Sequence, residues 1–112
     1  MLNNYQTQIL NHIIQNSITK IPIGMGQADI IKAFDDYCLE KNTTICVIVG
    51  SKLFKTVYDE LEVKSSIIPY LSKGKDLLSD LYLIDFKSIH YRHRPKVLKI
   101  LQEHNLSYKI IS

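Results

Sequence analysis

The segment TTICVIVG, residues 43–50, constrains the fold of this chain more than any other feature. Its central residues, Ile45–Val49, are all apolar and mostly β-branched, so the segment favours a strand with no side turned to water. A strand that is apolar on both faces is typical of a parallel sheet covered by helices on each side. The sequence therefore predicts an α/β layered fold, with Gly50 closing a buried strand.

Helical and strand-like segments alternate along the rest of the chain. Apolar residues recur at helical spacing in four segments: from Leu2 to about Asn16, from Gln27 to Cys38, after Ser51 and after Pro95. Strands are predicted near residues 18–22, 44–49, 65–69, 81–86 and 107–111. This alternation predicts a central, mostly parallel five-stranded sheet with right-handed crossovers. We expect one domain, residues 1–112, because the chain is long enough for only one core.

Composition places the chain among ordinary globular proteins. Hydrophobic residues make up 46% of the 112 residues and charged residues 22%, so global disorder is not expected. The formal net charge of +3 permits a nucleic-acid partner without requiring one. No apolar run approaches the roughly 18 residues that span a bilayer, so no membrane association is expected. Cys38 and Cys46 are isolated and no signal peptide is seen, so we expect reduced thiols in a soluble, cytoplasmic protein.

The segment IPIGMGQA, residues 21–28, has the glycine spacing of a phosphate-binding loop that opens onto a helix. Backbone N–H groups at such a helix start can hold an anion, so Gly24 and Gly26 are candidate phosphate-binding residues. The position of the usual lysine holds Gln27, and the following Ser/Thr position holds Ala28. The same two glycines also fit an ordinary strand-to-helix turn, and the sequence leaves both interpretations open.

The ordered set of motifs resembles the first RecA-like domain of superfamily 2 helicases and of the related Snf2-type translocases. Gln6, in YQTQIL, stands where that family places an adenine-reading glutamine, ahead of the loop with Gly24 and Gly26. CVIVGSKLFKTVYDEL is similar to motif Ia, LYLIDF is similar to motif II with Asp85 as its acid, and LSYKIIS stops where motif III would begin. The resemblance covers nearly the whole chain. It implies a three-layer RecA-like (P-loop NTPase-like) domain, with the loop and Asp85 at one edge of the sheet.

Departures from the family motifs imply that ATP is not hydrolysed. Phosphoryl transfer depends on placed charge and metal ligands, and Gln27 and Ala28 supply neither. Phe86 stands where the family has a water-orienting Glu, and Ser88 replaces the final His of motif II. Ile21 occupies a position that is usually small, so we expect its side chain to crowd a phosphate. What would remain is a vestigial nucleotide site made of Gln6, Gly24, Gly26, Gln27 and Asp85. It has no catalytic residue, metal or cofactor, and weak ATP or anion binding is left open.

A basic segment, HYRHRPKVLK, follows the strand that ends near Asp85. It holds arginines, lysines and histidines within ten residues, and such a run can contact phosphates. The resemblance also places the Ser51-Lys52 turn of motif Ia against a nucleic-acid backbone. Together they give a candidate nucleic-acid site: Ser51, Lys52, Arg92, Arg94 and Lys96. Each of these candidates also has a structural interpretation. The basic segment fits a solvated surface, Gln6 fits a surface position on a helix, and Asp85 fits a helix cap.

The sequence therefore predicts a helicase-like binding module without catalytic activity. A protein partner is favoured because the ATP chemistry is lost while the sheet and helices are intact. Binding of DNA or RNA, and binding of a nucleotide without hydrolysis, are the alternatives. The degenerate motifs would fit a viral or mobile-element origin, with the host cytoplasm as the place of action.

Overall fold

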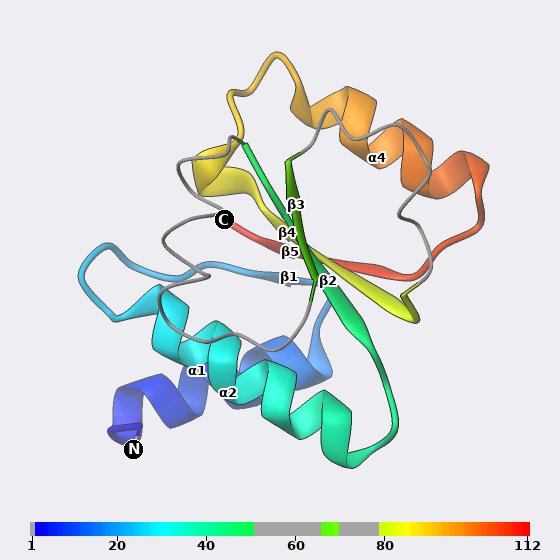
Figure 1. The fold of residues 1–112 in the computed structure, drawn as a ribbon. Coiled ribbons are helices and arrows are strands. Elements are labelled where there is room, and N and C mark those ends of the chain that lie inside the picture. The colour runs from blue at the N-terminus through cyan, green and yellow to red at the C-terminus, as the bar shows by residue number, and fades with distance from the viewer. Residues whose placement is uncertain (1, 51–65, 70–78) are drawn as a thin grey trace.

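The computed structural model describes residues 2–50, 66–69 and 79–112, whose strands form one sheet between helices (Figure 1). The helices are α1 (Asn4–Gln15), α2 (Gln27–Glu40) and α4 (Arg94–Glu103), with a short 3₁₀ turn, η1 (Phe86–Ser88). The strands are β1 (Ile18–Thr19), β2 (Ile45–Val49), β3 (Ser66–Pro69), β4 (Leu81–Asp85) and β5 (Tyr108–Ile111). Figure 1 shows α1 and α2 on one side of the sheet and α4 on the other, which is an α/β layered arrangement.

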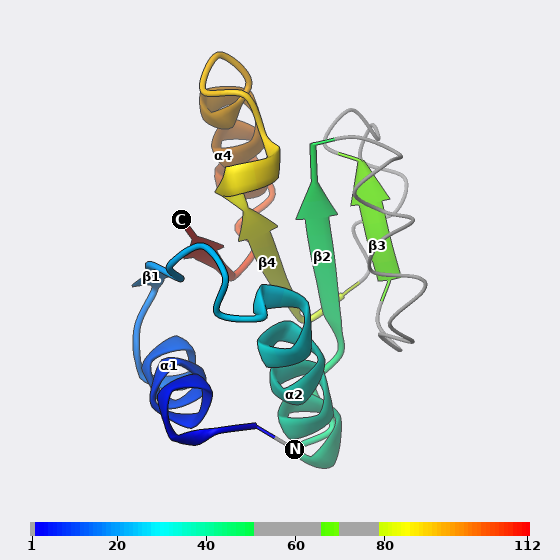
Figure 2. The ribbon, with the colours of Figure 1, turned by 90° about the vertical axis from the view of Figure 1, so that its left-hand side faces the viewer.

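All neighbouring strands of the sheet are parallel, in the order β1-β5-β4-β2-β3. The arrows of β2, β3 and β4 point the same way in Figure 2. The prediction of an α/β fold around a parallel sheet is confirmed. The strand predicted over residues 18–22 is shorter, because β1 covers only two residues. Ile21 still donates its N–H to the Ser112 carbonyl at 3.0 Å, but Pro22 has no N–H with which to continue the pairing.

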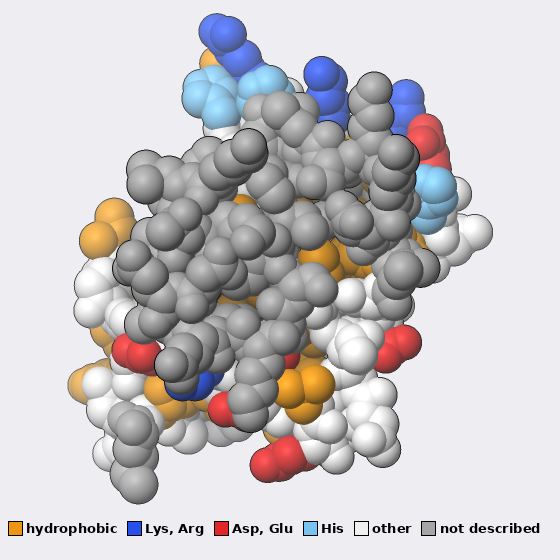
Figure 3. All heavy atoms as spheres, in the orientation of Figure 1, with side chains coloured by type: hydrophobic (Ala, Val, Ile, Leu, Met, Phe, Trp, Pro, Cys, Tyr) orange, Lys and Arg blue, Asp and Glu red, His pale blue; other side chains and the backbone are white. Residues whose placement is uncertain are grey.

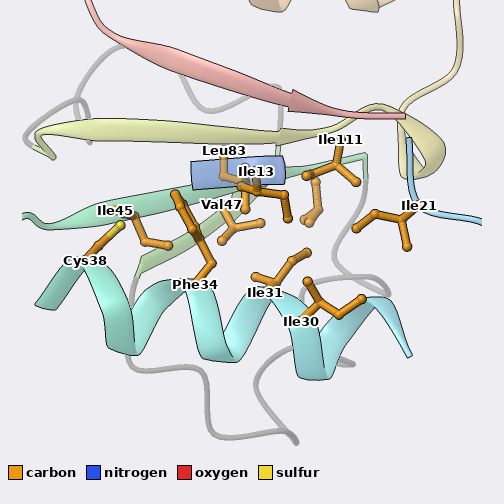
Figure 4. Close-up of a cluster of buried hydrophobic side chains, with 11 residues drawn as sticks. Ile13, Ile21, Ile30, Ile31, Phe34, Cys38, Ile45, Val47, Leu83 and Ile111 are labelled. Carbon is orange, nitrogen blue, oxygen red and sulfur yellow. The ribbon is translucent and has the colours of Figure 1, made fainter. Parts of the chain in front are cut away.

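Strand β2 is buried on both faces, as TTICVIVG predicts. Its residues alternate between two cores, because successive side chains of a strand point to opposite sides of the sheet. Val47 belongs to the core beneath α1 and α2, together with Ile13, Phe34 and Leu83 (Figure 4). The second core lies on the side of α4 and comprises Cys46, Ile48, Tyr82, Ile84, Ile89, Val97, Leu101 and Ile110.

Helix α1 is held by polar groups at both ends. At its start, Asn3 Oδ1 accepts from the Gln6 N–H at 2.8 Å, and Gln6 Oε1 accepts from the Asn3 N–H at 3.0 Å, which is a capping box. At its end, Lys109 Nζ donates to the carbonyl oxygens of Ile14 at 3.2 Å and Asn16 at 2.8 Å. A cation there interacts favourably with the negative end of the helix dipole. Desolvation at this position lowers the pKa of Lys109 from its ordinary value.

The other predicted elements agree closely with the structure where it describes them. The strand predicted near 65–69 is β3, the strand predicted near 107–111 is β5, and the last helix begins one residue before Pro95. The helix predicted after Ser51 lies outside the described residues. Among the helices that the structure describes, none has the length and apolar character needed to cross a bilayer.

Candidate functional site

The carboxyl ends of three strands lie in one row. Thr19 of β1 is paired in register with Ile111 of β5, and Ile111 is paired with Asp85 of β4. Thr19 and Asp85 are each 3% exposed although both are polar, and the Thr19 hydroxyl lies 2.9 Å from His12 Nδ1. We call residues 20–26, which lead from β1 into α2, the glycine loop. The glycine loop and Asp85 leave the sheet at the same edge, which is where parallel α/β sheets bind their ligands.

The glycine loop contains a tight turn. The Met25 N–H donates to the Pro22 carbonyl at 3.3 Å, and Gly24 has a φ of +86°. This combination is typical of a type II turn, whose third residue needs a positive φ. Gly26, with a φ of +70°, then caps the start of α2. The backbone of the turn therefore requires both glycines whether or not a phosphate is bound.

Gln6 ties the glycine loop to α1. Its Nε2 donates to the Met25 carbonyl at 3.0 Å, while its Oε1 serves the capping box with Asn3. A Cβ on Gly26 would lie 2.7 Å from Gln6 Nε2, so this contact also depends on the glycine. Adenine recognition by Gln6 stays a prediction. It would require the Gln6 side chain to give up its hydrogen bonds to Met25 and Asn3 and to form hydrogen bonds with the base. The signal for the structural role is the Asn-x-x-Gln pattern of residues 3–6, which is that of a capping box.

Two isoleucines of the glycine loop have opposite surroundings. Ile21 is fully buried in the core beneath α1 and α2, and Figure 4 shows it turned inward on the same side as Ile30. Ile21 therefore anchors the loop to the core. We had expected its side chain to crowd a phosphate, but it points into the core. Ile23, at the second position of the turn, is 97% exposed. The loop thus presents an apolar side chain to solvent from a turn that is fixed on both sides.

Asp29 lies beside the start of α2. It stands in the first turn of the helix, and one of its carboxylate oxygens is 3.4 Å from the point where a Cβ on Gly26 would lie. A carboxylate at this end interacts favourably with the helix dipole. It also repels a second anion at the same helix start, because like charges at short distance destabilise each other. The position that the glycine spacing offers to a phosphate therefore already carries a negative group.

The turn after β4, residues 86–93, is joined to the end of β2. Ser88 Oγ accepts from the Gly50 N–H at 3.0 Å and donates to the Asp85 carbonyl at 2.9 Å. A Cβ on Gly50 would lie 1.7 Å from the Ser88 carbonyl oxygen, so only glycine fits there. Ser88, at the last position of the segment that resembles motif II, therefore has a structural role. Sequence reasoning missed this contact, because nothing in the sequence links two residues 38 positions apart.

The two arginines of the candidate nucleic-acid site have different surroundings. Arg94 donates from Nε to the Ile89 carbonyl at 3.0 Å and from an Nη to the Phe86 carbonyl at 2.8 Å. Its guanidinium also lies 5.0 Å from the centre of the Phe86 ring. Arg92 and Lys96 are exposed. The structure places these three residues at the junction of the turn after β4 with the start of α4, where Arg94 holds the turn. Ser51 and Lys52 lie outside the described residues.

A groove of about 380 Å³ lies between α1 and α2, and no pattern in the sequence predicts it. It is lined by Leu2, Gln6, Asp29, Lys32, Ala33 and Asp36. Two carboxylates and one ammonium group make it mixed in charge. In the part of the chain that the structure describes, no group of three His, Cys, Asp or Glu side chains is arranged to hold a metal ion.

Comparisons with protein-family models, with curated proteins and with solved structures find no match for this chain. The resemblance to helicase domains therefore stays a prediction. A proposed function must rest on the geometry of the glycine loop and of the turn after β4.

Proposed function

We propose that this chain is a degenerate RecA-like domain that binds a protein partner through the glycine loop and does not hydrolyse ATP. The observation that carries the proposal is the side chain of Ile23, which is 97% exposed at the tip of a fixed turn. Single exposed apolar side chains are common on protein surfaces. Ile23 differs from most because Ile21, the Pro22–Met25 hydrogen bond and the Gln6–Met25 hydrogen bond all restrain the loop that presents it.

A restrained apolar tip is suited to a protein partner. An interface gains affinity when the contacting residue is already held in its bound conformation, because less conformational entropy is lost on binding. Burial of an isoleucine side chain contributes roughly 1.5–3 kcal/mol. The tip carries no charge that would select a phosphate, and Asp29 opposes an anion at the neighbouring helix start. These features favour an apolar pocket on a partner over a nucleotide as the ligand of the loop.

The sheet geometry supports the RecA-like part of the proposal. Strand β5 lies between β1 and β4, so the glycine loop and Asp85 are separated by two strand spacings, roughly 10 Å. That separation is short enough for one bound group to reach both. The loss of hydrolysis follows from the side chains, because Gln27 and Ala28 supply neither the cation nor the metal ligand that phosphoryl transfer requires.

The test is an affinity capture from the native host with three forms of the protein. Wild type and the variants Ile23→Asp and Leu39→Asp serve as bait, since Leu39 is 38% exposed near the far end of α2. We expect a specific partner with wild type and with Leu39→Asp, and loss of that partner with Ile23→Asp. Circular dichroism must show that both variants are folded. Recovery of the same proteins in equal amount with all three baits would contradict the proposal.

A further inference from the structure

The surface around the start of α4 is basic, and the chain segment that forms it contains no acidic residue. Residues 86–102 contain five Lys or Arg and two His, and no Asp or Glu. Figure 3 shows blue and pale-blue side chains gathered at the top of the molecule, which is the position of α4 and its preceding turn in Figure 1. We call His90, Tyr91, Arg92, His93 and Lys96 the basic turn.

The basic turn carries an exposed ring. Tyr91 is 65% exposed, and its ring centre lies 4.5 Å from that of His90 at an interplanar angle of 31°. The His93 ring lies 6.2 Å from the His90 ring. Three rings therefore stand together on one short turn, beside cations. A planar surface of this kind accepts a nucleobase, because every base has a face that stacks on an aromatic ring.

The backbone beneath these rings is held in place. The His93 N–H donates to the His90 carbonyl at 2.9 Å, and the Arg92 N–H donates to His90 Nδ1 at 3.3 Å. Arg94 closes the turn from below through the carbonyl oxygens of Ile89 and Phe86. With Arg94 used internally, the exposed Lys and Arg side chains of the basic turn itself are Arg92 and Lys96. Arg94 therefore holds the turn, whereas Arg92 and Lys96 are exposed to solvent.

We propose that the basic turn binds single-stranded nucleic acid, with a base stacked on Tyr91 and adjacent phosphates contacted by Arg92 and Lys96. The surface is small, so the binding is weak and independent of sequence, with a Kd of roughly 10⁻⁴ to 10⁻⁶ M at physiological salt. An anionic membrane is the other polyanion that such a charge would attract. The ring surface favours a nucleic acid, because stacking uses the flat face of Tyr91 whereas a lipid headgroup does not. This site is separate from the glycine loop and does not rest on the protein partner proposed above.

The experiment is a titration of fluorescein-labelled oligothymidylate and oligouridylate, followed by fluorescence anisotropy at low and moderate salt. Each test variant has a matched control elsewhere on the surface. Tyr91→Ala is compared with Tyr5→Ala, which removes another exposed tyrosine, and Arg92→Ala with Lys20→Ala, which removes another exposed positive charge. We expect Tyr91→Ala to weaken binding roughly tenfold, the size of one lost stacking contact. We expect Arg92→Ala to reduce the slope of log K against log salt by about one.

The controls decide between a site and a general charge effect. Wild-type affinity in Tyr5→Ala, and an unchanged salt slope in Lys20→Ala, support a site at the basic turn. Equal losses in a test variant and its control would show that only the net charge of the protein matters, and would overturn the proposal. Absence of oligonucleotide binding at low salt would overturn it as well, with or without binding to phosphatidylserine vesicles in a parallel sedimentation assay.

Discussion

Two connections between a strand and a helix, both at the carboxyl edge of the sheet, are built in different ways. The glycine loop leaves β1 and is held mainly by one buried side chain, Ile21, and by the amide of Gln6. The turn after β4 is held by side chains that bond to backbone groups, those of Ser88 and Arg94. The first connection leaves an isoleucine in solvent, and the second leaves aromatic rings and cations. One edge of a sheet can therefore present two surfaces of different chemistry, each fixed by its own contacts.

The largest effect is expected at the junction that fixes the second connection. In Gly50→Ala, the new Cβ would lie 1.7 Å from the Ser88 carbonyl oxygen, so backbone must move. We expect a loss of about 3 kcal/mol or more in the free energy of unfolding, measured by urea denaturation. The matched control is Gly24→Ala, where no atom lies within 4 Å and only the positive φ opposes a side chain. That variant should lose about 1 kcal/mol. Equal losses would show that the two connections are equally tolerant.

A smaller loss is expected from the arginine that closes the turn after β4. Arg94→Ala removes two hydrogen bonds from a charged donor to backbone carbonyls, and we expect a loss of about 2 kcal/mol in thermal denaturation experiments. Arg92→Ala is the control, because Arg92 is exposed, and its stability should change by less than about 0.5 kcal/mol. If Arg92→Ala is as unstable as Arg94→Ala, the two arginines do not have the separate roles assigned to them.

The glycine loop should respond more mildly to loss of its polar contact. Gln6→Ala removes half of the capping box and the hydrogen bond to the Met25 carbonyl, so we expect a loss of about 1 kcal/mol in urea denaturation. Gln8→Ala, on an exposed position of the same helix, is the control and should be close to wild type. A negligible effect of Gln6→Ala would show that Ile21 alone secures the loop.

The smallest expected signal is that of ATP turnover. Purified protein should show no ATPase activity above background, with or without DNA or RNA, because Gln27 and Ala28 at the start of α2 supply neither the cation nor the metal ligand that phosphoryl transfer needs. Gln27→Lys introduces one cation but leaves Ala28 and Phe86 in place, so it should also be inactive. Turnover in wild type that Asp85→Ala abolishes would refute both the loss of catalysis and the proposed use of the loop.

The sequence was informative where burial alone decides the structure. No residue of Ile45–Val49 is polar, and a strand of that kind is typically covered by a layer on each face, as β2 is. The glycine spacing likewise predicted a tight connection between a strand and a helix, and both glycines have a positive φ there, but it left open whether that connection binds a phosphate. In both cases the information lies in neighbouring residues, so a short window of sequence contains it.

The details of the candidate sites depend on the path of the backbone, which the sequence pattern does not show. Arg92 and Arg94 are the same residue type two positions apart, yet only the second reaches the carbonyl oxygens of its own turn. Whether an arginine faces solvent or backbone is decided by the path of the chain after β4. Likewise, the meeting of Gly50 with Ser88 results from the pairing of β2 with β4 in the sheet. Such contacts follow from the fold and could not be predicted before it.

The place of β5 in the sheet has a consequence for the order in which the chain can fold. Among the strands that the structure describes, β1 pairs with β5 alone, and the end of α1 is held by Lys109 of that same strand. Residues 18–19 are synthesised before residues 108–111, so β1 can pair with β5 only after β5 has been made. Strands β2, β3 and β4 can pair with one another before that. Contacts so distant along the chain slow folding, so we expect β1 and the end of α1 to be fixed in place after the pairing of β2, β3 and β4.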